Sequence, residues 1–81
     1  MVTGRAELRR RCGYTLRQLS KDSAVSVSQL SGWERHELTL PEESVMRISF
    51  ALYFSAKETP RFDTVQTMAE YLSKGTHAQS R

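Results

Sequence analysis

Closely spaced helix starts constrain the fold of this chain more than any other feature of its sequence. In a capping box, a Ser or Thr side chain at the start of a helix accepts a hydrogen bond from the backbone amide three residues later. The Glu or Gln side chain of that later residue accepts a hydrogen bond from the backbone amide of the Ser or Thr. The pairs that fit are Thr15 with Gln18, Ser26 with Gln29, and Thr39 with Glu42. Starts so close together leave room only for short helices and short turns.

Apolar periodicity between and beyond these starts predicts five helices. Leu8 and Cys12 share a face ahead of Gly13, a residue that readily adopts the left-handed conformation in which helices end. The fourth helix has Pro41 in its first turn, where a missing amide proton costs nothing. The predicted ranges are 4–12, 16–23, 27–35 and 40–54, and the fifth helix follows Pro60, with Asp63 and Gln66 as its capping pair and Lys74 and Gly75 at its end.

The buried faces of the last two predicted helices complete an all-α fold. Apolar side chains recur at three- and four-residue steps in both, as one face of a helix requires. They are Val45, Ile48, Ala51 and Leu52 in the fourth, and Val65, Met68, Ala69 and Leu72 in the fifth. We expect a compact bundle of about five helices, in which residues 1–75 form one domain and residues 76–81 a flexible tail.

Composition excludes several classes of protein. At 81 residues, with 38% hydrophobic and 26% charged side chains, the chain has the make-up of one small globular domain. Its single cysteine, Cys12, excludes an internal disulfide, and Cys12, His36 and His77 are too few and too scattered for a metal site. No nucleophile has an activating base beside it, and no membrane-length apolar run or signal peptide occurs. We therefore expect a cytoplasmic protein that is not an enzyme and uses no cofactor, metal or small-molecule ligand.

The net charge of +3 is unevenly divided along the chain. Residues 1–21 carry six Lys or Arg and one Glu, which gives +5, whereas residues 22–58 carry three basic and six acidic side chains, which gives −3. A basic segment favours contact with a polyanion, because each Lys or Arg that meets a phosphate releases a condensed counterion. A solvated helix face explains the same charges, so charge alone does not decide between the two.

The second and third predicted helices form the segment that points to a function. Only two or three residues separate them, and so short a connection makes two helices cross steeply, as in a helix-turn-helix. The apolar residues that would lock the crossing are Leu19, Val25, Leu30 and Trp33. The outward face of the later helix is small and uncharged, which suits entry into a confined groove. That face comprises Val27, Ser28, Ser31 and Gly32.

From Leu8 to Leu52 the sequence resembles the phage repressor and Cro class of helix-turn-helix DNA-binding proteins, also called the XRE or lambda-repressor-like family. The resemblance covers more than half of the chain at unbroken spacing. The matching residues are Leu8-Arg9, Gly13-Tyr14-Thr15, Leu19-Ser20, Val25-Ser26, Leu30-Ser31, Trp33-Glu34-Arg35 and Ile48 with Ala51-Leu52. The resemblance implies a bundle of about five helices whose third helix enters the major groove of DNA.

Matching positions imply roles for individual residues in base recognition. Val27, Ser28 and Gly32 fall where the family reads base edges, with Ser31 as a neighbour. Valine favours a thymine methyl group, and serine discriminates weakly because it both donates and accepts hydrogen bonds. Gln29 has two competing roles that the sequence leaves open, as an adenine contact or as the partner in its capping box.

Phosphate contacts are expected at the start of both helices and on basic side chains beside them, because free amides and the helix dipole attract anions there. These residues are Thr15, Arg17, Lys21 and Ser26, with Arg9 and Arg10 from the first helix. Leu16 and Glu37 replace polar and basic residues that the family commonly has, which weakens the expected binding. Arg9 and Glu34 match a pair that forms a structural salt bridge in some members, and Ala24 stands where the family prefers a left-handed glycine.

The fifth predicted helix and the segment before it are more apolar than a terminal segment needs. Their apolar residues either close the core or form the interface of a homodimer, and both accounts stay open. The residues are Phe62, Val65, Met68, Tyr71 and Leu72. A dimer would place two recognition helices one DNA turn apart, about 34 Å, and implies an inverted-repeat operator.

These patterns favour a sequence-specific transcriptional regulator that binds double-stranded DNA, similar to a Cro-type or small phage or plasmid repressor that occludes a promoter. The alternative is a protein-interaction module, antitoxin-like or regulator-binding, that retains the helical bundle. The acidic middle of the chain and the weak base-reading residues keep that alternative open.

Overall fold

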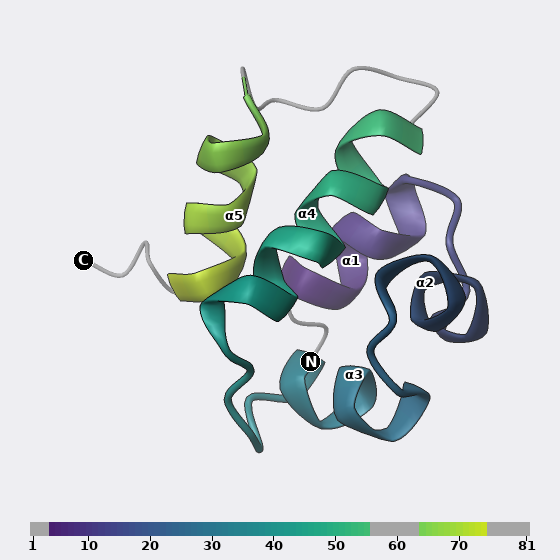
Figure 1. The fold of residues 1–81 in the computed structure, drawn as a ribbon. Coiled ribbons are helices and arrows are strands. Elements are labelled where there is room, and N and C mark those ends of the chain that lie inside the picture. The colour runs from purple at the N-terminus through teal and green to yellow at the C-terminus, as the bar shows by residue number, and fades with distance from the viewer. Residues whose placement is uncertain (1–3, 56–63, 75–81) are drawn as a thin grey trace.

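Five α-helices make up the part of the chain that the computed structural model describes, residues 4–55 and 64–74. They are α1 Gly4–Arg11, α2 Leu16–Ser23, α3 Val27–Glu34, α4 Glu42–Ser55 and α5 Val65–Lys74. No strand occurs in those residues, so the predicted all-α class is confirmed. Figure 1 shows α4 and α5 side by side, with α1 passing behind α4 and with α2 on the side of α4 away from α5.

The core lies where α4 meets its neighbours. Each of the helices from α2 to α5 contributes at least one side chain that is almost completely buried, and the apolar ones are Leu19, Leu30, Ile48, Leu52, Met68 and Leu72. Complete burial of a side chain of this kind stabilises the fold by about 1.5–3 kcal/mol. The predicted buried face of α4 is confirmed at Val45, Ile48 and Leu52, while Ala51 is half-buried at the margin of the core.

The short turns on either side of α2 form as the sequence predicts. Gly13 has a φ of 83° after α1, and Ala24 adopts the left-handed conformation, with φ 62° and ψ 30°, after α2. Thr15 caps α2 with a complete capping box that includes Gln18. Three residues then connect α2 to α3, which packs against it, and Figure 1 shows that the two helix axes run in clearly different directions.

The predicted start of α4 is wrong by two residues. The Thr39 box does not form, and the helix begins at Glu42, with the Pro41 carbonyl accepting hydrogen bonds from the amides of Ser44 and Val45 at 3.0 and 3.1 Å. Proline disfavours the helical conformation in the residue before it, so Leu40 stays outside the helix and lies in the core. Pro41 therefore stands at the cap position instead of inside the first turn.

The predicted cap of α5 is also wrong. Thr64 caps this helix, because its side-chain oxygen accepts a hydrogen bond from the amide of Thr67 at 3.1 Å. Asp63, the expected cap, lies outside the described residues, as do Phe62 and the expected flexible tail at 76–81.

Helix α5 closes the core, as one of the two accounts of this segment predicts. Met68 and Leu72 are completely buried, and Ala69 is buried beside them. Completely buried side chains have no surface for a partner, so the assignment of Met68 and Leu72 to a dimer interface is wrong. Val65 and Tyr71 are half-buried and retain some exposed surface.

Candidate nucleic-acid interface

The first turn of α3 points into solvent. Val27 is 41% exposed, and Ser28 and Gln29 are exposed beside it, while Leu30 and Trp33 anchor the opposite face of the helix in the core. The sequence predicts this placement for Val27, Ser28, Leu30 and Trp33, whereas Gln29 is not among the residues that it assigns to the outward face. The exposed turn offers one branched apolar side chain, one hydroxyl and one amide.

Ser26 caps α3 and leaves the Gln29 side chain uninvolved in the cap. The Ser26 hydroxyl accepts a hydrogen bond from the Gln29 amide at 3.1 Å and lies 3.5 Å from the Ser28 hydroxyl. The return bond from the Gln29 side chain, which a complete capping box requires, is not formed. Of the two roles left open for Gln29, the capping role is therefore absent, and its exposed amide group remains available for a ligand.

Gly32 does not belong to the outward face, and its predicted place there is wrong. The residue is buried, and a Cβ atom built on it would lie 2.8 Å from Cδ2 of Leu38. Leu38 comes from the loop after α3 and covers this side of the helix. Because Gly32 has almost no accessible surface, we leave it out of the candidate interface.

The C-terminal end of α3 is closed by a Schellman motif, in which two amides beyond the helix bond back to its last turn. The amide of His36 donates to the Trp33 carbonyl at 3.0 Å, and that of Glu37 to the Gly32 carbonyl at 2.8 Å. His36 takes the left-handed conformation, with a φ of 63°, that glycine usually supplies at this position. The motif fixes where the residues that follow α3 lie.

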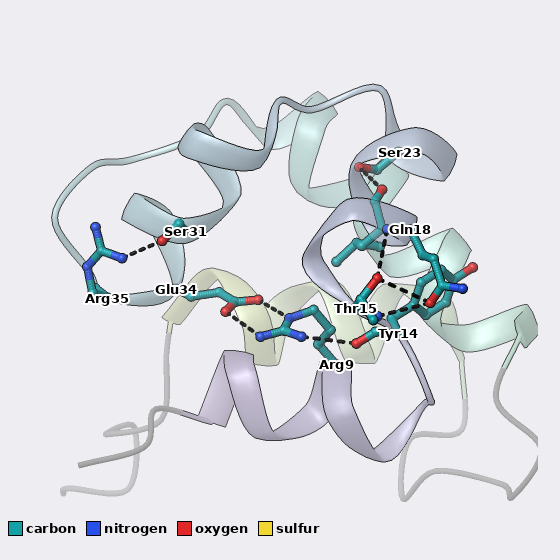
Figure 2. A network of polar contacts seen from close by, with 9 residues as sticks. Arg9, Tyr14, Thr15, Gln18, Ser23, Ser31, Glu34 and Arg35 are labelled. Carbon is teal, nitrogen blue, oxygen red and sulfur yellow. Dashed lines mark hydrogen bonds and ion pairs between the residues drawn. The ribbon is translucent and has the colours of Figure 1, made fainter.

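Ser31 is only partly available at the surface. It is half-buried, and its hydroxyl accepts a hydrogen bond from Arg35, one turn further along, as Figure 2 shows. Arg35 also pairs with Glu37 through two hydrogen bonds of 3.1 and 2.9 Å. This bonding lowers the pKa of the Glu37 carboxyl and raises the pKa of Arg35.

Arg9 and Glu34 form the salt bridge that the family resemblance implies. Nε and Nη2 of Arg9 donate to the two carboxylate oxygens at 2.7 and 3.1 Å, and Nη1 donates to the Tyr14 carbonyl at 3.0 Å (Figure 2). The two side chains are only 9% and 7% exposed. The bridge ties α1 to the end of α3. Each guanidinium nitrogen of Arg9 already donates to Glu34 or Tyr14, and the side chain is only 9% exposed, so we leave Arg9 out of the candidate interface and its phosphate contact stays a prediction.

Arg5 is a structural residue that the sequence reasoning missed. Its guanidinium lies 4.4 Å from the centre of the Trp33 ring and donates to the carbonyls of Trp33, Leu72 and Ser73, which joins the ends of α3 and α5. Burial lowers the pKa of Arg5, and nearby Glu34 acts in the opposite direction. The four-residue step from Arg5 to Arg9, interleaved with the half-buried Leu8, is the signal that this face turns inward.

The remaining basic side chains of the first two helices are exposed. They are Arg10 and Arg11 on α1, and Arg17 and Lys21 at a four-residue step on α2. Arg11 is paired with Glu7 at 3.5 Å, across one turn of α1. The predicted cap residues Thr15 and Ser26 are exposed as well. The candidate interface therefore combines the caps of α2 and α3, the first turn of α3, and Arg10, Arg17 and Lys21.

A scan against protein-family models and searches of curated proteins and of solved structures found no match for the chain. Across residues 4–55 and 64–74, no three His, Cys, Asp or Glu side chains lie close enough together to hold a metal ion. No helix in this part of the chain is both long and apolar enough to cross a membrane.

Proposed function

We propose that this chain is a sequence-specific, double-stranded DNA-binding regulator of transcription in which α2 and α3 act as a helix-turn-helix. One observation carries the proposal: the first turn of α3 projects Val27, Ser28 and Gln29 into solvent while the opposite face of the helix is fixed in the core. Side chains on a helix held in this way have a fixed direction. Helix-turn-helix proteins contact base edges in the major groove with this end of the recognition helix.

The three exposed side chains favour sites rich in A·T pairs. The methyl groups of Val27 fit the methyl group of thymine. The side-chain amide of Gln29 can donate to N7 of adenine and accept from its N6 amino group in the major groove. Ser28 bonds to several bases and discriminates little. Each well-made bidentate contact discriminates against a wrong base by about 1–3 kcal/mol, so Gln29 is the strongest single reader in this set.

Phosphate contacts would come from α1, α2 and the helix starts. The exposed Arg17 and Lys21 share one face of α2, and Arg10 adds a third cation from α1. Thr15 and Ser26 mark helix starts whose backbone amides and dipoles favour an anion. A protein that neutralises three phosphates loses affinity steeply with salt, with a slope of about −2.7 in log K against log salt concentration.

A homodimer on an inverted-repeat operator in the cytoplasm completes the proposal, with repression by occlusion of a promoter, as in small phage or plasmid repressors. Two copies would read two half-sites about one DNA turn apart. On α5, the surface that remains for such a contact includes the half-buried Val65 and Tyr71.

Selection of bound duplexes from a random library, followed by footprinting on the winning sequence, tests the proposal. We expect an A·T-rich inverted repeat with half-sites centred about 10 base pairs apart. Absence of any duplex binding at about 50 mM salt, where phosphate contacts are strongest, overturns the proposal.

A protein-interaction module is the second candidate, and one observation favours it. Phe50 and Phe54 on α4 are 50% and 69% exposed, with their rings stacked at 5.8 Å, and Tyr53 meets Phe54 edge-on. Exposed aromatic side chains in a cluster are typical of protein contacts. If replacement of both phenylalanines by serine abolishes the regulatory effect in cells but leaves duplex binding intact, protein contact is the activity that matters.

A further inference from the structure

Arg35 supplies all the positive charge of α3 and the loop after it. Residues 27–41 contain no other Lys or Arg. Its side chain is 56% exposed, at the C-cap of α3. It follows Ser28 and Ser31 at steps of three and four residues, so it continues the edge of the helix that begins at the exposed first turn. The major groove is only about 12 Å wide, so when the first turn of α3 enters it, a long side chain on this edge of the helix can reach a phosphate backbone.

The guanidinium of Arg35 binds a carboxylate with the hydrogen-bond geometry that it would use for a phosphate. Nε and Nη2 donate in parallel to the two oxygens of Glu37 at 3.1 and 2.9 Å, while Nη1 donates to Ser31. Arginine binds phosphate oxygens with the same pair of parallel bonds. The Glu37 carboxylate thus takes up the two parallel donors of Arg35 that a phosphate would use.

The chain contains a second Arg–Glu pair with the same geometry, and the difference in exposure shows which of the two pairs can exchange its carboxylate for another anion. Arg9 and Glu34 are also joined by two parallel bonds, but their side chains are 9% and 7% exposed, against 56% and 60% for Arg35 and Glu37. A buried pair cannot lose one partner without leaving a desolvated charge. An exposed pair contributes only about 0–1 kcal/mol and is easily exchanged for another anion.

We propose that Glu37 is an intramolecular substitute for a DNA phosphate, and that Arg35 becomes a phosphate contact when a duplex displaces Glu37. This inference rests on the proposed DNA binding and adds a contact that neither the sequence pattern nor the family resemblance assigns. The loop after α3 then lowers affinity for all duplexes, because each binding event has to break the Arg35–Glu37 ion pair.

The test measures the binding of a random-sequence 30-base-pair duplex by fluorescence anisotropy between about 50 and 200 mM salt. Arg35→Ala should weaken binding and reduce the salt slope by about 0.9, the value for one lost phosphate contact. Glu37→Gln should tighten binding about two- to fivefold, which corresponds to the small free energy of an exposed pair. Both side chains are exposed, so thermal melting of either variant should match the wild type.

A double-mutant cycle separates masking of Arg35 from simple repulsion by Glu37. If Glu37 acts through Arg35, Glu37→Gln tightens duplex binding in the wild-type background. In the Arg35→Ala background, Glu37→Gln should tighten binding no more than Glu70→Gln does, which is a matched loss of one exposed negative charge on α5. Equal gains in both backgrounds would overturn the masking role.

The outcomes also separate this inference from the proposed function. Unchanged affinity and salt slope in Arg35→Ala, with weaker binding in Arg17→Ala, would overturn the inference and leave DNA binding standing. Failure of every variant and of the wild type to bind duplex would overturn both.

Discussion

At the scale of single residues, the two inward-facing arginines of α1 hold the proposed recognition helix in place. Arg9 forms an ion pair with the Glu34 carboxylate, and Arg5 stacks on Trp33 and donates a hydrogen bond to its carbonyl. Charges at this depth are tolerated only when every donor has a partner. No side-chain nitrogen or oxygen buried in the described part of the chain lacks a hydrogen bond. The angle of α3 is therefore set by polar contacts as well as by the core.

Breaking the buried bridge should destabilise the fold strongly. Arg9→Met leaves Glu34 unpaired in a desolvated place, and we expect the free energy of unfolding in urea to fall by about 3–5 kcal/mol. The double variant Arg9→Met/Glu34→Leu removes both charges and should regain most of that loss. A loss below about 1 kcal/mol in the single variant, as for an exposed pair, would contradict the structural role.

The left-handed Ala24 is a site where a smaller residue should stabilise the protein. With a φ of 62°, its Cβ is crowded by the backbone, which costs alanine on the order of 1 kcal/mol more than glycine. We expect Ala24→Gly to raise the free energy of unfolding by up to about 1 kcal/mol in chemical denaturation. Ala51→Gly, inside α4, is the matched control and should lower it by about 1 kcal/mol. A destabilised Ala24→Gly variant would show that the strain at this turn is negligible.

At the scale of secondary-structure elements, local signals located the helices, and where two local signals competed, the stronger one set the helix start. Thr15 and Ser26 fix the starts of α2 and α3 because a cap needs only the next three residues. The start of α4 moved because Pro41 restricts Leu40, an effect that outweighs the cap pattern at Thr39.

The contents of the candidate site were less predictable than its position. The exposure of Val27 and Ser28 follows from helical periodicity, but the burial of Gly32 depends on how the side chain of Leu38 folds back from the next loop. The burial of Arg5 depends on carbonyls at the ends of α3 and α5, far away in sequence. Periodicity along one helix contains no information about such partners.

The exposed face of α2 should make contacts that do not depend on DNA sequence. Arg17→Ala removes one exposed cation from α2, so we expect weaker binding to every duplex and a salt slope reduced by about one unit. Arg17→Lys keeps the charge and should keep the slope. Anisotropy titrations on a selected and a random duplex give both quantities, and a loss confined to the selected duplex would show that Arg17 reads bases instead.

At the scale of the whole molecule, folding divides the basic residues of the N-terminal segment into two groups. Arg5 and Arg9 are used inside the protein, and Arg10, Arg11, Arg17 and Lys21 remain at the surface, with Arg11 paired to Glu7. The +5 of residues 1–21 therefore overstates the charge that can meet a phosphate. Acidic residues beyond α2 reduce the attraction further, so we expect modest affinity and strong dependence on salt.

The proposed function depends most on base reading by the first turn of α3, and one substitution tests this role directly. Val27→Arg places a long cation at an exposed position, 41% accessible, so the fold should melt as the wild type does. Gln66→Arg, at an exposed position on α5, adds the same charge elsewhere and is the matched control. The measurement is competitive binding between the selected duplex and variants of its half-site. We predict that Val27→Arg changes the preferred half-site, whereas Gln66→Arg keeps the wild-type preference. Unchanged half-site preference in Val27→Arg would contradict base reading by α3.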